Sequence, residues 1–157
     1  MLRLTKKADY GLIAMKHLAE HGDKKSCSAK DLAESYGIPQ EALAKILQRL
    51  AKAGLLVSHH GINGGYTLAR DAGTISALEV IRAIDGPLFI TSCVTTRGEC
   101  GQIERCTVRE PLRQVSQHII EVLGRLSLTD MKDSKRREPV AKKTATEAAA
   151  ELVTLSI

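Results

Sequence analysis

Residues 28–54 read SAKDLAESYGIPQEALAKILQRLAKAG, and they place two helix patterns on either side of a tight turn. A serine followed three residues later by an aspartate matches a capping box, which starts a short helix over residues 28–35. Gly37 can end this helix in the left-handed conformation, and Pro39 can open a third helix that runs to about Ala53. Two helices joined by a glycine-containing turn predict a helix-turn-helix motif.

The third helix has two opposed faces. Its apolar face consists of Leu43, Ile46, Leu47 and Leu50. Its opposite face carries Lys45, Arg49 and Lys52 at spacings of four and three residues. A solvated surface helix would show the same pattern, so this helix alone leaves DNA binding and a plain exposed face open.

A hairpin pattern follows directly after the basic helix. Residues 55–58 favour a strand, residues 66–68 favour its return, and the intervening HHGINGG contains Asn-Gly and Gly-Gly steps that tolerate positive φ. A two-stranded hairpin after a basic helix is typical of a winged helix. Such a fold puts the helix in the major groove and the tip of the wing beside the backbone or the minor groove.

Apolar spacing predicts further helices over residues 5–21 and 76–84, and a long helix after residue 108. The long helix carries a stripe at alternating spacings of three and four, namely Leu112, Val115, Ile119, Val122 and Leu126. The stripe could pack against the core of its own chain. A stripe this regular on a late helix favours pairing with a second copy of the chain.

The sequence therefore predicts a mainly α fold with a small β-hairpin, a winged helix-turn-helix plus a long dimerisation helix. The expected divisions are a DNA-binding domain (1–90), a cysteine loop (91–108), the dimerisation helix (109–131) and a disordered tail (132–157). No apolar run is long enough for a membrane span and no signal peptide is visible, so we expect a cytoplasmic protein without a membrane partner. The net charge of +5 is only a weak indication of nucleic-acid binding.

Three cysteines fall close together, with the spacing Cys93-x6-Cys100-x5-Cys106. Because disulfides are rare in the cytosol, this cluster indicates metal or redox chemistry. The spacing lacks the x2 interval of zinc knuckles, and soft thiolates suit an iron–sulfur cluster. An iron–sulfur cluster, zinc, a thiol switch and inert cysteines all stay open, and a fourth ligand would come from elsewhere. Cys27 lies far away and is expected to be a small buried residue.

No set of catalytic residues in the sequence points to an enzyme instead. The sequence has no phosphate-binding glycine loop, no nucleophile elbow and no His-Glu-x-x-His motif, so we expect no enzyme. His17 and His21 are spaced to share one helix face and could bind a metal together, although a surface feature is the favoured interpretation.

At this point the residues resemble the winged-helix regulator family of IscR and NsrR, over roughly residues 1–131. The matching stretches are MLRLTK (1–6), ADYGL (8–12), GINGGY (61–66), AIDGPL (83–88), the three-cysteine loop and LSLTDM (126–131). Within the family, the leading Met-Leu-Arg and the segment from Asp85 to Cys93 most resemble the regulator of the SUF iron–sulfur assembly operon.

The resemblance implies a homodimer, joined through the long helix, that binds a palindromic operator in double-stranded DNA. It also implies a 2Fe-2S or 4Fe-4S cluster on the three cysteines. IscR-type members place a histidine ligand where this chain has Arg109, which cannot ligate a metal. NsrR-type members can use an aspartate of the partner chain, and Asp9 of the partner subunit matches that position. His60 stands near the wing tip where IscR has an arginine.

The expected function is a cluster-sensing transcription regulator that represses iron–sulfur assembly genes of the SUF type. One alternative is a nitric-oxide or redox sensor that represses other genes, and another is an iron–sulfur or zinc carrier that does not bind DNA. A carrier needs neither the basic stripe nor the wing. The residues expected nearest to DNA are Gln40, Glu41, Ala44, Lys45, Gln48 and Arg49 of the third helix, and His60 and Asn63 of the wing.

Overall fold

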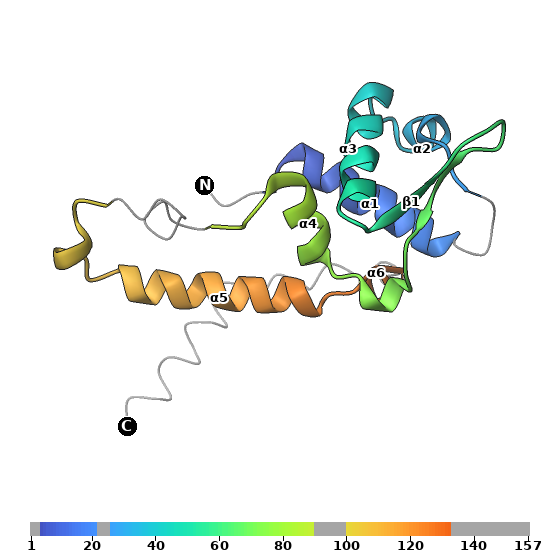
Figure 1. Cartoon of the computed structure of the whole chain (residues 1–157). Coiled ribbons are helices and arrows are strands. Elements are labelled where there is room, and N and C mark those ends of the chain that lie inside the picture. The colour runs from blue at the N-terminus through green and yellow to red at the C-terminus, as the bar shows by residue number, and fades with distance from the viewer. Residues whose placement is uncertain (1–3, 22–25, 90–99, 133–157) are drawn as a thin grey trace, which may run out of the picture.

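Helices form most of the described part of the chain, which covers residues 4–21, 26–89 and 100–132 of this computed structural model. In chain order the elements are α1 (Lys6–Glu20), α2 (Ala29–Tyr36), α3 (Gln40–Lys52), β1 (Leu56–His59), β2 (Gly65–Leu68), η1 (Ala72–Thr74), α4 (Ala77–Asp85), η3 (Ile103–Arg105), α5 (Arg109–Arg125) and α6 (Leu128–Lys132). The prediction of a mainly α fold with one small hairpin is confirmed (Figure 1).

The helix ends follow the side-chain chemistry that the sequence indicated. The Ser28 hydroxyl accepts a hydrogen bond from the backbone N–H of Asp31 at the start of α2. Gly37 ends α2 in the left-handed conformation, with φ of 62°. Ser76 and Glu79 form a reciprocal capping box at the start of α4. These local signals fix where α2 and α4 begin and where α2 ends.

The core lies where α1 crosses α3 and α4. Leu43, Leu47 and Leu50 of α3 are fully buried there, as the apolar face of this helix predicts. Gly11 of α1 allows the close approach, since a Cβ at this position would lie only 2.1 Å from Cδ1 of the buried Ile84. The packing of α1 therefore depends on the absence of a Cβ at Gly11 as well as on apolar contacts.

The hairpin is antiparallel, with Leu56 opposite Leu68 and His59 opposite Gly65. A third segment, which the sequence did not reveal, braces it. The backbone N–H of Cys27 donates to the Tyr66 carbonyl at 3.2 Å, and the Tyr66 N–H donates to the Cys27 carbonyl at 2.9 Å. The residues before α2 thus hold the wing against the helix-turn-helix unit.

The chain leaves α4 and returns along α5, which extends away from the winged domain as a separate arm (Figure 1). We expected one helix over residues 109–131, but α5 ends at Arg125 and α6 begins at Leu128. The break arises because the Leu126 carbonyl accepts a hydrogen bond from the N–H of Ala77, and Leu128 is fully buried. The end of the arm is therefore fastened to the DNA-binding unit by α6.

Among the described residues, no helix has the length and apolar character needed to cross a membrane. The predicted disordered tail falls outside the described residues except for Lys132, which ends α6. The predicted cysteine loop is described only from residue 100 onward, so Cys93 also lies outside.

Candidate nucleic-acid interface and cysteine segment

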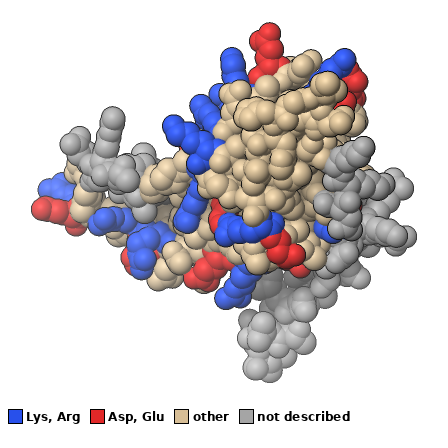
Figure 2. All heavy atoms as spheres, turned by 45° about the vertical axis from the view of Figure 1, so that its right-hand side comes forward, with Lys and Arg blue, Asp and Glu red and all other residues tan. Residues whose placement is uncertain are grey.

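Helix α3 presents most of the residues expected nearest to DNA. Its buried leucines pack into the core and fix the position of the helix. Of the expected residues, Ala44 is half-buried, and the exposed ones are Gln40, Glu41, Lys45, Gln48 and Arg49. Figure 2 shows that Lys and Arg side chains follow one edge of the winged domain, beside the α5 arm. The face that the sequence pattern predicted is therefore exposed and polar. The contacts of individual residues on this face show which of its side chains are constrained.

Arg49 does not extend freely from this face. Its Nη1 donates a hydrogen bond of 2.9 Å to the backbone carbonyl of Ile84, in the last turn of α4. That carbonyl belongs to the end of a helix, where carbonyl groups lack partners within the helix and a nearby cation is favourable. Arg49 thus ties α3 to the end of α4, which restricts how far its guanidinium can reach toward a base.

A groove of about 380 Å³ lies between α3, the first turn of α1 and the end of α4. Its lining residues are Lys7, Pro39, Glu41, Ala42, Lys45, Ile46, Arg49 and Ile84. Glu41, Lys45 and Arg49 of the expected DNA-contacting set line it, whereas Gln40, Ala44 and Gln48 do not. The α3 face is therefore divided into a stripe at the groove and a neighbouring stripe outside it.

The wing tip carries the exposed residues His60 and Asn63. Two contacts hold the tip in place: the Ser26 hydroxyl donates to the Asn63 carbonyl at 2.7 Å, and His59 Nε2 lies 2.8 Å from the Thr67 hydroxyl. The left-handed glycine of the turn is Gly61, with a φ of 110°, whereas Gly64 and Gly65 of the expected Asn-Gly and Gly-Gly steps do not have positive φ. The sequence missed Ser26 as a brace because it lies 37 residues from its partner.

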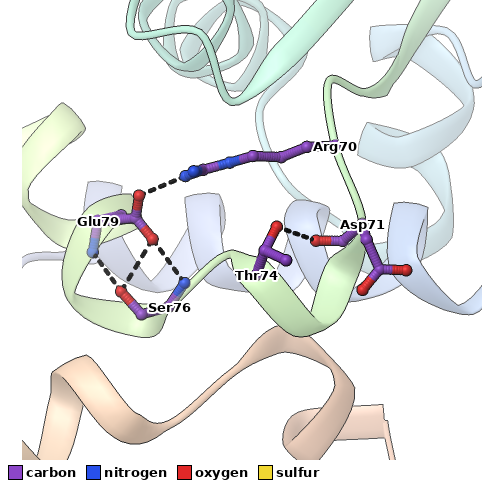
Figure 3. Close-up of polar contacts among 5 residues, drawn as sticks. All are labelled: Arg70, Asp71, Thr74, Ser76 and Glu79. Carbon is purple, nitrogen blue, oxygen red and sulfur yellow. Dashed lines mark hydrogen bonds and ion pairs between the residues drawn. The ribbon is translucent and has the colours of Figure 1, made fainter.

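The base of the wing is joined to α4 by an ion pair between Arg70, just after β2, and Glu79 (Figure 3). Glu79 also accepts a hydrogen bond of 2.9 Å from the backbone N–H of Ser76. Partial burial would raise the pKa of Glu79, but the hydrogen bonds from Ser76 and Arg70 outweigh it and lower the pKa overall. The carboxylate stays charged and connects the wing to the helix that leads toward the cysteines.

Of the three clustered cysteines, Cys100 and Cys106 lie in the described part, on either side of the η3 turn. Both thiols are free and half-buried. Residues 100–105 line an open hollow of about 510 Å³. Within the described residues, no three His, Cys, Asp or Glu side chains come together to hold a metal ion. Two half-buried thiols that flank one short turn fit the chemistry of a thiolate-bound iron–sulfur cluster, with the remaining ligands to be supplied from outside this segment.

Cys27 lies apart from this segment, beside the wing. Burial, and after it the nearby carboxylate of Asp31, raise the pKa of the Cys27 thiol. The thiolate is the form that binds metals, so this environment disfavours Cys27 as a ligand. We expected a small buried residue here, but Cys27 is half-buried.

Asp9, the expected ligand from a partner chain, is exposed on the first turn of α1. Thr5 caps this helix, and Asp9 forms no ion pair with Lys6 or any other described residue. Arg3, a second basic residue near Asp9 in the sequence, lies outside the described residues. Arg109, which stands where IscR-type proteins place histidine, is exposed at the first position of α5.

The described residues cover the apolar stripe of α5 only in part, since Leu112 and Ile119 are half-buried. Val115 is 47% exposed and Val122 is 66% exposed, and Leu126 is also exposed. Val115 and Val122 line a shallow, apolar groove together with His118, Ile119 and Leu123. Packing against the described residues therefore does not account for the whole stripe.

Comparison with known proteins agrees with this architecture. The sequence profile of Rrf2, described as iron-dependent transcriptional regulators, matches residues 4–134. The chain is 37% identical over 130 residues to the HTH-type transcriptional regulator IscR of Xenorhabdus nematophila, covering 83% of this chain and 79% of that protein. It is 35% identical to IscR of Vibrio vulnificus, covering 83% and 77%.

Solved structures show the same fold. T. potens IscR has a TM-score of 0.67 and 32% identity, covering 83% of this chain and 85% of that one. CymR, the global cysteine regulator of B. subtilis, has a TM-score of 0.66 and 27% identity, covering 84% and 97%. These relatives are transcription regulators, which confirms the expectation of a winged-helix regulator and not an enzyme. The chain belongs to the Rrf2 family of DNA-binding transcription regulators.

Proposed function

We propose that the protein is an iron–sulfur cluster-sensing repressor of SUF-type cluster assembly genes, active in the cytoplasm as a homodimer on a palindromic operator. The observation that carries this proposal is the path of the chain from α4 to α5. Helix α4 is tied to α3 by Arg49 and Ile84, and the cysteine loop separates α4 from the arm. A change in this loop would therefore act on both the DNA-binding unit and the dimer helix.

The cysteines Cys93, Cys100 and Cys106 would hold a 2Fe-2S or 4Fe-4S cluster together with Asp9 of the partner subunit. The cluster would supply sensitivity to oxidants, nitric oxide or iron supply through its own assembly and loss. The chain contributes soft thiolates and one hard carboxylate, and the bond to the carboxylate is expected to be the most labile. Arg109 donates no lone pair and stays outside the ligand set.

On DNA, α3 would enter the major groove with its exposed residues toward the base edges, and the wing would lie beside the backbone or minor groove. The expected contacts are Gln40, Glu41, Ala44, Lys45, Gln48, Arg49, His60 and Asn63. The wing is braced by Ser26 and Arg70, so it is held at a fixed position relative to α3. A palindromic operator then follows from two such units related by the dimer axis.

The homodimer rests on the partly uncovered stripe of α5. Two copies that pair along Val115, Ile119 and Val122 would remove the exposed apolar surface from water. The arm projects from the winged domain, so it is accessible to a second copy (Figure 1).

Anaerobically purified full-length protein should be coloured and should shift DNA fragments from upstream of SUF-type genes. Substitution of Cys93, Cys100 or Cys106 by serine should abolish the visible charge-transfer bands. The Cys27→Ser variant should retain these bands. Binding to promoters of other genes but not to SUF-type promoters would favour a nitric-oxide or redox sensor with other targets. Coloured protein that binds no DNA would favour a carrier.

A further inference from the structure

The groove beside α3 collects positive charge from two helices. Lys7 comes from the first turn of α1, and Lys45 and Arg49 come from α3. Glu41 is the one acidic residue in the lining, so the groove carries a net charge of +2. Its floor is apolar and contains the buried Ile46 and Ile84. An anion placed here would meet several cations above an apolar floor.

None of these three cations forms an ion pair within the described part of the molecule. Lys7 and Lys45 are exposed and form no ion pair with any described residue. Arg49 uses one N–H on the Ile84 carbonyl, and a guanidinium has five. The bond to Ile84 fixes the orientation of the group while leaving donors for a second partner. A prepositioned arginine loses less conformational entropy when it binds an anion.

The expected position of α3 on DNA indicates what this anion is. A helix of about 10–12 Å diameter fills a major groove about 12 Å wide, so the phosphates of both strands flank it. When the stripe of Gln40, Ala44 and Gln48 faces the bases, the neighbouring groove stripe turns toward one strand. The phosphates of that strand would then pass over the mouth of the groove between α3 and α1.

We propose that Lys7, Lys45 and Arg49 form a clamp for two successive backbone phosphates of one strand, so that α1 is part of the DNA interface. This inference rests on the proposed DNA-binding function and adds a residue that the sequence pattern did not reveal. Two phosphates carry a charge of −2, which balances the net charge of the groove. Arg49 then positions the backbone and does not read a base.

The clamp also depends on the last turn of α4. The carbonyl of Ile84 holds Arg49, and the next residue, Asp85, ends the helix before the chain runs toward the cysteine loop. A displacement of this turn would move a phosphate contact directly. The groove is therefore a place where the state of the loop can change DNA affinity without rearrangement of α3.

The test is the salt dependence of DNA binding by the full chain and its Lys7→Gln variant, on the operator and on a random duplex of equal length. Lys7→Gln removes one phosphate contact from each chain of the proposed dimer. It should therefore lower both affinities by the same factor, roughly fivefold to tenfold for each chain near physiological salt, and reduce the slope of log K against log salt by about two. Lys7→Gln combined with Lys45→Gln should reduce the slope by about four. Lys16→Gln is the matched control, since it removes one charge from the same helix at a residue paired with Glu20.

Three outcomes would overturn the clamp. The first is an unchanged slope in Lys7→Gln, and the second is an equal effect in Lys16→Gln, which would reflect net charge alone. The third is a loss confined to the operator, which would make Lys7 a base-reading residue. Wild-type protein that binds neither duplex would instead refute the proposed function, so the two failures are distinguishable.

Discussion

The hydroxyl of Thr5 lies 2.7 Å and 2.9 Å from the two carboxylate oxygens of Asp85, across 80 residues of sequence. Thr5 is the N-cap of α1 and also accepts a hydrogen bond from the N–H of Ala8. Asp85 is the last residue of α4. The start of the first helix is thereby fixed to the end of the helix that leads into the cysteine loop, and a carboxylate at a helix N-terminus is electrostatically favourable.

Thr5→Val should lower the free energy of unfolding by about 1–2 kcal/mol, because valine keeps the shape but removes both the cap and the bond to Asp85. Thr5→Ser retains the hydroxyl and should cost much less. Urea denaturation of the two variants measures the difference. A loss in Thr5→Ser without a loss in Thr5→Val would show that the methyl group, and not the hydroxyl, is responsible.

Gly65→Ala should destabilise the wing by at least about 1–3 kcal/mol, since overpacking has this cost and the obstructing atoms are backbone. A Cβ at Gly65 would lie 2.4 Å from the carbonyl oxygen of Cys27 and 2.9 Å from the N of Ser28. Gly101→Ala is the matched control, because a Cβ there meets nothing within 4 Å. Thermal unfolding and hydrogen exchange of the hairpin amides would report the effect, and a Gly65→Ala protein as stable as Gly101→Ala would contradict it.

The stability of the protein should fall at mildly acidic pH because of His17. Burial, and after it the neighbouring His21, lower the pKa of His17, although Glu20 opposes the shift. The folded state therefore takes up this proton less readily than the unfolded chain, whose imidazole has a pKa of about 6.5. The contribution of neutral His17 to the free energy of unfolding is fully present above the pKa of the unfolded chain. It is lost as the pH falls below that pKa and toward the lower pKa of the folded state.

Urea unfolding of wild type and His17→Gln at pH 7.5, 6.5 and 5.5 tests this direction. Wild type should lose more stability than the variant between the first and last pH. Parallel losses would mean that His17, which also contacts the Tyr36 hydroxyl at 3.0 Å, titrates alike in both states.

Val122→Lys should shift the protein toward monomer, because it places a charge in the exposed apolar stripe that we expect to pair between two chains. Gln117→Lys puts the same charge on an exposed position of α5 outside that stripe. It should leave the molar mass of the protein in solution at that of the wild-type dimer. Size-exclusion chromatography with light scattering distinguishes the two. A dimer that withstands Val122→Lys would place the interface elsewhere.

Periodic and local signals predicted most of the fold. The apolar positions of α3 and the capping residues Ser28 and Ser76 depend on neighbours within one or two turns, so the sequence is sufficient to identify them. The break after Arg125 was missed, although Ser127 and Asp130 form the same kind of cap and are visible in the sequence. The continuing apolar spacing through Leu126 hid this signal.

The interface residues show the limit of pattern analysis more clearly. The spacing of Lys45 and Arg49 indicated a basic face, but the partner of Arg49 is a backbone carbonyl 35 residues away. A carbonyl has no sequence signature, so only the packing of α4 against α3 reveals this contact. Lys7 was missed for the same reason, because it meets the other cations through the crossing of α1 and α3.

Asp9 is proposed to bind the cluster of the other chain, and the arrangement within one chain favours this. Figure 1 shows the segment around Cys100 and Cys106 at the far end of α5, well apart from the helix that carries Asp9. Asp9 has no ion pair among the described residues that would compete with a metal. A dimer in which each arm reaches past the other would bring the thiolates to the partner's first helix.

Mixed dimers with two affinity tags test whether this ligand acts between chains. In a dimer of one Asp9→Ala chain and one Cys100→Ser chain, ligation between chains leaves one site with both defects and the other intact. About half of the wild-type cluster absorbance should then remain, as in a control dimer of wild type with Asp9→Ala. Ligation within a chain damages both sites and should leave almost none. The Asp9→Ala homodimer must also lose or shift the visible spectrum, because a wild-type spectrum there would remove the carboxylate from the ligand set.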